Sequence, residues 1–175
     1  MTAPDVAAGV DLATLNELPA GSFADGIGLL FERAPRFLAR LARARPFRSW
    51  DELFERAESV ARSMPEPDQL QLIDGHPRLG ADPALLRPRS EQSWREQGYD
   101  RLEPEQVATE LARLNDAYEA RFGFRFVVFV AGRPRADLLP IMSAALGAER
   151  GTEIRRALSD VVAIARARRE HLRWP

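Results

Sequence analysis

Apolar residues recur at helical spacing along most of this 175-residue chain, and this pattern decides the expected fold class. Ser49 and Glu52 form the capping-box pattern that begins a helix, which is predicted to end near Met64 and Pro65. Further helices are predicted over residues 23–41, broken at Pro35, and over 67–74, 90–97, 104–121, 137–146 and 152–172. The prediction is an all-α fold, a single-domain bundle of about six to eight helices.

Two segments interrupt the helical pattern. Residues 76–89 are rich in proline and are predicted to form a loop. Residues 124–131 read FRFVVFVA, which by propensity is a buried strand. No other segment offers a convincing partner strand, and an isolated strand leaves its backbone groups without a sheet ladder. We therefore expect an extended buried segment, or the start of a helix, over residues 124–131.

Cysteine and lysine are both absent, so all 25 basic residues are arginine. Without cysteine, the chain has no disulfide and no thiolate nucleophile. Without lysine, it has no Schiff-base partner for pyridoxal phosphate and no lysine-imine chemistry. The composition thus excludes several common routes to carbon–carbon bond cleavage.

The remaining composition indicates one soluble domain over residues 1–175, with about residues 1–10 disordered. The two histidines, His76 and His171, have no metal-ligand spacing, so we expect no metal site. A net charge of −1 with interspersed signs argues against a nucleic-acid partner. No apolar run is long enough for a membrane span, and no secretory signal is visible, so a cytoplasmic location is expected.

His76 is the first candidate for chemistry. It follows a predicted helix and precedes a proline in the proline-rich loop. An imidazole in such a place can exchange protons near neutral pH. The competing interpretation is a histidine that caps the preceding helix. His171 lies among arginines near the end of the chain and is expected to be a solvated surface residue.

Ser93, Glu96 and Gln97 are the second candidate group. On a helix, their spacing places a hydroxyl, a carboxylate and an amide on one face. Such a trio suits a ureido or amide ligand, which presents donors and acceptors side by side. The competing interpretation is an ordinary polar surface face.

The third group is aromatic and follows Asn115. By default its rings form core, although they are also suited to line a pocket for a flat heterocycle. Asn115 is mildly unfavourable in the middle of a helix, and we expect it to tie down a neighbouring loop. The aromatic residues of this group are Tyr118, Phe122, Phe124, Phe126 and Phe129.

Taken in order, these stretches resemble a known family. Residues 76–80, HPRLG, are similar to the His-Pro-x-Leu/Ile-Gly signature of 2-oxo-4-hydroxy-4-carboxy-5-ureidoimidazoline (OHCU) decarboxylases. Residues 93–97 resemble the family's S-x-x-E-Q motif, and residues 114–127 resemble its L-N-x-x-Y block followed by F-G-F-x-F-V. The closing stretch, residues 153–168, is similar to its E…I-A-R-x-R pattern, so the resemblance covers almost the whole chain.

The resemblance implies an all-α homodimer that acts on a small molecule without metal or organic cofactor. The family reaction converts OHCU to (S)-allantoin and carbon dioxide. By the matching motifs, His76 is the catalytic acid/base and Glu96 its catalytic partner. The implied substrate-binding residues are Pro77, Ser93, Gln97, Phe126, Val127, Val128, Phe129 and Val130.

One position departs from the family pattern. Where the family has an arginine that contacts the substrate, this chain has Ala145. Arg133, Arg135 and Arg150 are candidates to take over its role. The departure favours one alternative, a diverged paralogue that acts on a different heterocyclic or ureido acid. A second alternative is a non-catalytic binding module that retained the fold.

Overall fold

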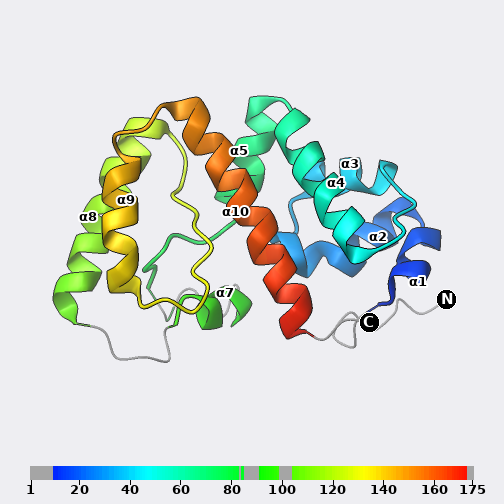
Figure 1. Cartoon of the computed structure of the whole chain (residues 1–175), viewed down its shortest axis with the longest axis horizontal. Coiled ribbons are helices and arrows are strands. Elements are labelled where there is room, and N and C mark those ends of the chain that lie inside the picture. Colours follow the sequence, from blue (N-terminus) through cyan, green and yellow to red (C-terminus); the bar gives the residue numbers. More distant parts are fainter. Residues whose placement is uncertain (1–9, 83, 85–90, 99–103, 173–175) are drawn as a thin grey trace. The chain divides into compact units, whose positions relative to one another are not determined.

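The computed structural model describes residues 10–82, 84, 91–98 and 104–172. Within them the chain is helical, with no strand, which confirms the all-α prediction (Figure 1). The contacts divide the chain into two compact units. The first comprises residues 1–75 and 158–175, and the second comprises residues 76–157. The disorder expected for about residues 1–10 falls almost wholly on residues 1–9, outside the described part.

Three short helical elements begin the first unit. They are α1 (Leu12–Glu17), α2 (Ala20–Ile27) and the 3₁₀ turn η2 (Gly28–Phe31). After η2, Glu32 and Arg33 adopt left-handed φ angles of 48° and 55°. This turn separates η2 from α3 (Pro35–Arg43), whose first residue is a proline. The predicted break at Pro35 is thus confirmed, and it falls where proline can begin a helix.

Two longer helices follow in the first unit, α4 (Trp50–Ser63) and α5 (Glu66–Asp74), and both lie against α3. The predicted cap of α4 is present, because the Ser49 side chain accepts a hydrogen bond from the Glu52 N–H at 3.1 Å. The Glu52 carboxylate in turn accepts from the Arg48 N–H at 2.8 Å. These two contacts satisfy donors that would otherwise stay open at the start of the helix.

The second unit carries every residue predicted for the site. Its helices are α7 (Glu91–Glu96), α8 (Glu105–Phe122), η3 (Arg135–Leu138) and α9 (Leu139–Ala145), with the first turns of α10 (Arg150–His171). α8 and α9 lie side by side (Figure 1). Gly123, at φ 76°, ends α8 as predicted, because the left-handed conformation is open to glycine without strain.

The segment after α8 is neither helix nor strand, as expected for a strand-like sequence without a partner. Its alternate residues Phe124 and Phe126 are buried, and their rings meet the Tyr118 ring edge-on at centroid distances of 5.6 and 5.1 Å. Aromatic packing against α8 therefore takes the place of a sheet ladder in holding this segment. Among the described helices, none is long and apolar enough to span a membrane.

Candidate active site

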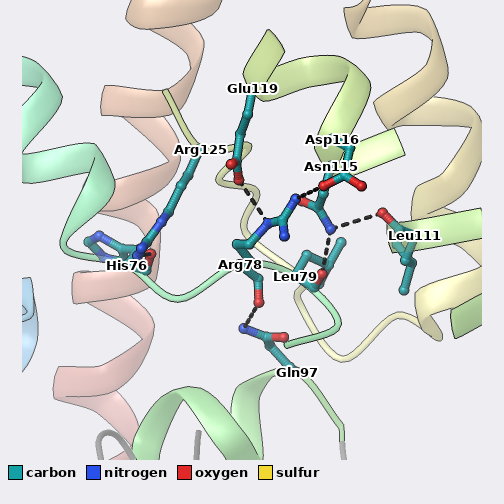
Figure 2. A network of polar contacts seen from close by, with 9 residues as sticks. All are labelled: His76, Arg78, Leu79, Gln97, Leu111, Asn115, Asp116, Glu119 and Arg125. Atoms are coloured by element: carbon teal, nitrogen blue, oxygen red, sulfur yellow. Dashed lines mark hydrogen bonds and ion pairs between the residues drawn. The ribbon is translucent and has the colours of Figure 1, made fainter. Parts of the chain in front are cut away.

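His76 opens the second unit, in the residue after Gly75, which forms the C-cap of α5. Its side chain is buried, at 3% exposure. The guanidinium of Arg125 donates from Nη1 to the His76 carbonyl oxygen at 3.1 Å (Figure 2). The backbone of His76 is thus tied to the aromatic segment that follows α8. Pro77, the next residue, is half-buried.

Gln97 connects the S-x-x-E-Q motif, residues 93–97, to the motif that begins at His76. Its Oε1 accepts a hydrogen bond from the Gly80 N–H at 3.0 Å, and its Nε2 donates to the Arg78 carbonyl at 3.2 Å. One carboxamide therefore satisfies two backbone groups of the His76 loop, residues 76–82. Figure 2 shows the Gln97 side chain reaching up to this loop from below.

Asn115 holds the same loop from α8. Its Nδ2 donates to the carbonyl oxygen of Leu79 at 2.8 Å and to that of Leu111 at 2.9 Å. The expectation that Asn115 ties down a neighbouring loop is confirmed. Leu79 itself is buried, so its carbonyl has a protein partner rather than solvent.

The loop also packs closely on the α8 surface. Gly80 has a φ of 75°, and a Cβ placed on it would lie 3.1 Å from Leu111 Cδ1. Both the conformation and the space therefore favour glycine at this position. Beside it, Arg78 forms ion pairs with Asp116 at 2.6 Å and with Glu119 at 2.8 Å. The His76 loop is thus anchored by backbone and side-chain contacts together.

The face of α7 predicted from the S-x-x-E-Q motif is turned inward. Ser93 and Gln97 are buried, at 3% and 8% exposure, and Glu96 is half-buried. This arrangement differs from an ordinary polar surface face. The structure brings Gln97 to the His76 loop, and it places Ser93 and Glu96 on the same short helix. Their roles as substrate ligand and catalytic partner remain predictions.

Residues 126–130 form the remaining predicted part of the site. Phe126, Val127 and Val130 are buried, whereas Val128 and Phe129 are half-buried. Two arginines hold the backbone of this segment. The first, Arg156, donates from Nη1 to the Val127 carbonyl at 2.8 Å, and its guanidinium carbon lies 4.7 Å from the centre of the Phe126 ring.

The second arginine, Arg133, donates to the carbonyl oxygens of Phe129 and Val130 at 2.6 and 3.0 Å. Arg150 also binds a backbone carbonyl, since its Nε donates to the Phe122 carbonyl oxygen at 2.9 Å. Arg133 and Arg150, both candidates for the role of the family arginine, thus each hold a backbone carbonyl. Ala145 is the last residue of α9 and is buried at 8% exposure.

A buried polar cluster connects α8 to α10. The Tyr118 hydroxyl donates to Glu153 Oε2 at 2.7 Å, and Arg156 Nε donates to the same oxygen at 2.9 Å. Burial, reinforced by the bond to the Glu153 carboxylate, raises the pKa of Tyr118 above its usual range. Since Arg156 also binds the Val127 carbonyl, this cluster is continuous with the segment 126–130.

Sequence reasoning missed the parts played by Arg125 and Arg156. Arg125 is the single charged residue in the run FRFVVFVA, and a charge inside an apolar run was a usable signal for a specific contact. Arg156 carried no such signal, because it stands beside Arg155 on an ordinary helical pattern. No group of three or more His, Asp or Glu side chains within the described ranges is placed to bind a metal ion.

Comparison with known proteins identifies the family of this chain. The family model described as OHCU decarboxylase matches residues 16–170. The chain is 30% identical over 161 residues to the OHCU decarboxylase of Halalkalicoccus jeotgali, covering 92% of this chain and 90% of that protein. It is 33% identical to the one from Haloferax volcanii, covering 90% and 92% respectively.

The chain is also 35% identical to the uric acid degradation bifunctional protein PucL of Bacillus subtilis, covering 88% of this chain. It spans only 31% of that protein's length. The similarity therefore concerns one part of a larger protein.

Two solved structures share the fold. A crystal structure of (S)-allantoin synthase superposes with a TM-score of 0.69 at 17% identity, over 93% of this chain and 54% of that one. A structure of OHCU decarboxylase in the presence of (S)-allantoin superposes with a TM-score of 0.63 at 21% identity, over 79% and 91% respectively. With its fold, its three ordered motifs and the family match over residues 16–170, the chain belongs to the OHCU decarboxylase family and is a carboxy-lyase.

Proposed function

We propose that this protein converts OHCU to (S)-allantoin and carbon dioxide, with His76 as general acid/base. The observation that carries the proposal is the pair of hydrogen bonds between Gln97 and the His76 loop, one accepted from the Gly80 N–H at 3.0 Å and one donated to the Arg78 carbonyl at 3.2 Å. These bonds unite the two motifs that the family uses for catalysis and binding. Relatives from Halalkalicoccus jeotgali and Haloferax volcanii, which match over nearly their full length, carry the name of this activity.

Decarboxylation leaves an electron pair on the substrate, and some group must accept it. The chain has no lysine to form an imine with a substrate or with pyridoxal phosphate. In OHCU, the carboxylate and a hydroxyl share one carbon of an imidazolinone ring, so the conjugated ring itself can take up the electrons. The protein then needs only to orient the acid and to move protons.

His76 is suited to move those protons. Its imidazole can accept the hydroxyl proton or deliver the proton that quenches the enol-like intermediate. Catalysis of this kind contributes roughly 10²–10⁴-fold in rate. We assign Glu96 to orient the ring and His76, and Ser93 and Gln97 to bind the polar groups of the ureido side.

The backbone of residues 126–130 and the ring of Pro77 complete the proposed substrate lining. The arginine contacts at Val127, Phe129 and Val130 limit how far this backbone can shift. A rigid lining keeps the developing charge next to fixed dipoles, which is the usual source of electrostatic stabilisation. Proton delivery from one side of the ring then sets the configuration of the allantoin.

The direct test generates OHCU in situ from urate with the two preceding enzymes and follows product by circular dichroism. Addition of the protein should produce one allantoin enantiomer faster than the spontaneous, racemic decay. A rate equal to the spontaneous background would contradict the proposed activity.

Two matched pairs of variants test the proposed roles of His76 and Glu96. His76→Gln should abolish turnover while the fold persists, and His171→Gln, at the only other histidine, should leave turnover unchanged. Glu96→Gln should lower kcat/KM, whereas Glu105→Gln, at the exposed start of α8, should not. Full activity in His76→Gln would remove His76 from the mechanism.

Ala145 favours a second candidate function, a paralogue that acts on a related heterocyclic or ureido acid. A guanidinium binds a carboxylate through two parallel hydrogen bonds, and an alanine offers none. A panel of such acids distinguishes the candidates, since the paralogue would decarboxylate one of them and leave OHCU to its spontaneous decay. The family likeness also leads us to propose a homodimer, which light scattering on the purified chain tests.

A further inference from the structure

We propose that Asn115 is a positioning residue for His76, which acts by holding the loop of residues 76–82 against α8. The inference rests on the proposed role of His76 in catalysis. Asn115 Nδ2 lies 2.8 Å from the carbonyl oxygen of Leu79, three residues after His76 (Figure 2). The side chain reaches 36 positions along the sequence to make this contact.

The orientation of the Asn115 amide follows from its two partners. Both are backbone carbonyl oxygens, those of Leu79 and Leu111, at 2.8 and 2.9 Å. A rotation that exchanged Oδ1 and Nδ2 would bring an acceptor against two acceptors. The two N–H groups of the amide are therefore both committed to backbone, and none is left for a substrate.

Asn115 therefore differs from Gln97 in its predicted role. The Gln97 carboxamide contacts the same loop but lies on the S-x-x-E-Q motif, which the family likeness assigns to substrate binding. Asn115 is buried at 3% exposure, and its donors point only at the backbone. Its effect on the reaction must pass through the position of the loop.

The position of Asn115 leaves one of its polar atoms unsatisfied, which a side chain with only a packing role would avoid. Asn115 Oδ1 is buried and accepts no hydrogen bond from the described residues. A buried acceptor without a donor is unfavourable, and such groups in native proteins call for an explanation. Fixing the Leu79 carbonyl, and with it the loop that carries His76, provides one.

The neighbouring contacts explain why this single bond matters. Arg125 holds the His76 carbonyl at 3.1 Å, and Gln97 holds the Arg78 carbonyl at 3.2 Å. The contact at Leu79 falls between those of Gln97 to Arg78 and to Gly80. Loss of Asn115 would free the Leu79 carbonyl, which the Asn115 amide bridges to the Leu111 carbonyl of α8.

The test compares Asn115→Ala with Leu114→Ala in the OHCU assay. Leu114 is the adjacent buried residue on α8, at 1% exposure, and its truncation also weakens the core. Displacing a catalytic group by about 1 Å can cost up to about 100-fold in rate. We therefore expect Asn115→Ala to lower kcat by roughly 10- to 100-fold with KM within about twofold. Leu114→Ala should lower Tm at least as far while kcat stays within about twofold.

The imidazole NMR signals give a readout that does not depend on turnover. The chain has two histidines, so the spectrum contains one signal set from His76 and one from His171. Asn115→Ala should shift or broaden the His76 signals and leave those of His171 in place. Leu114→Ala should leave both sets in place. Asn115→Ser, which keeps a short donor, provides a milder variant if the alanine variant does not fold.

The outcomes separate the two proposals. If the parent protein does not turn over OHCU, the proposed function fails, and the NMR comparison still decides whether Asn115 positions His76. Unchanged His76 signals in a folded Asn115 variant would overturn the inference. So would an equal loss of kcat in Leu114→Ala, because general weakening of α8 would then explain both variants.

Discussion

The Tyr118 hydroxyl donates a 2.7 Å hydrogen bond to the carboxylate of Glu153, and both side chains are buried. The same carboxylate oxygen accepts from Arg156, which also binds the Val127 carbonyl. The link between α8 and the first turns of α10 and the course of residues 126–130 thus both involve one buried carboxylate.

The first prediction concerns the stability of this cluster. Tyr118→Phe removes the hydroxyl but keeps the ring, so it isolates the hydrogen bond. Because the acceptor is charged and buried, we expect the free energy of unfolding to fall by about 1.5–3 kcal/mol. Urea denaturation measures the change. Glu110→Gln, in the exposed pair with Arg113, is the control and should cost less than about 1 kcal/mol. Equal losses would show that the buried bond contributes nothing special.

A second prediction concerns alkaline pH. The pKa of Tyr118 is raised above its ordinary value of 10.0, so the folded state holds this proton more tightly than the unfolded chain does. The associated stability is fully present below pH 10 and is lost as the pH rises beyond it. Thermal melts from pH 8 to pH 11 should therefore show a steeper fall in Tm for the parent than for Tyr118→Phe. Parallel curves of Tm against pH for the two proteins would mean that Tyr118 does not cause the loss of stability at alkaline pH.

The third prediction concerns Arg156. Its loss leaves Glu153 buried without its cationic partner and releases the Val127 carbonyl. Arg156→Gln should therefore lower stability by about 3 kcal/mol and reduce kcat/KM. Arg156→Lys keeps the charge but cannot reach both partners with the same planar fork, so it should recover stability more than activity. Complete recovery of both by lysine would argue that only the charge matters.

Glycine 80 provides the fourth prediction. Gly80→Ala meets both a left-handed φ of 75° and Leu111 Cδ1 at 3.1 Å, whereas Gly123→Ala meets only a φ of 76°. The strain of the backbone alone is worth about 1 kcal/mol. We expect Gly80→Ala to destabilise the protein by at least about 1 kcal/mol more than Gly123→Ala, because the Leu111 contact adds to the strain. Denaturation of the two variants side by side measures the difference, and equal losses would show that Leu111 yields freely.

The fifth prediction concerns the first unit. Arg168 is buried at 1% exposure, pairs with Glu32 at 2.7 Å and donates to the carbonyls of Leu29 and Leu30. Arg168→Met should cost about 3 kcal/mol, because it leaves a half-buried carboxylate and two carbonyls without their donor. Arg48→Met, at a side chain 91% exposed, should cost less than about 1 kcal/mol. Calorimetry on both variants tests the contrast.

Local sequence patterns determined the longer helices in the described part of this protein, such as α4 and α8. The capping pair Ser49 and Glu52, Pro104 before α8 and Gly123 after it act within a few residues, and their outcome follows from backbone geometry alone. Periodicity likewise placed α4, α5 and α8 close to their observed bounds. The short α1 was not predicted, because its six residues carry too little of a helical repeat.

Tertiary structure alone decided how the site is held together. The contacts of Asn115 with Leu79, of Arg78 with Asp116 and of Tyr118 with Glu153 join residues 35 to 38 positions apart. No local pattern encodes such a pairing, because a helical repeat specifies which face is buried but not what that face meets. The motifs therefore predicted which residues form the site, whereas the contacts of α8 with the loop and with the first turns of α10 decided how the backbone there is held.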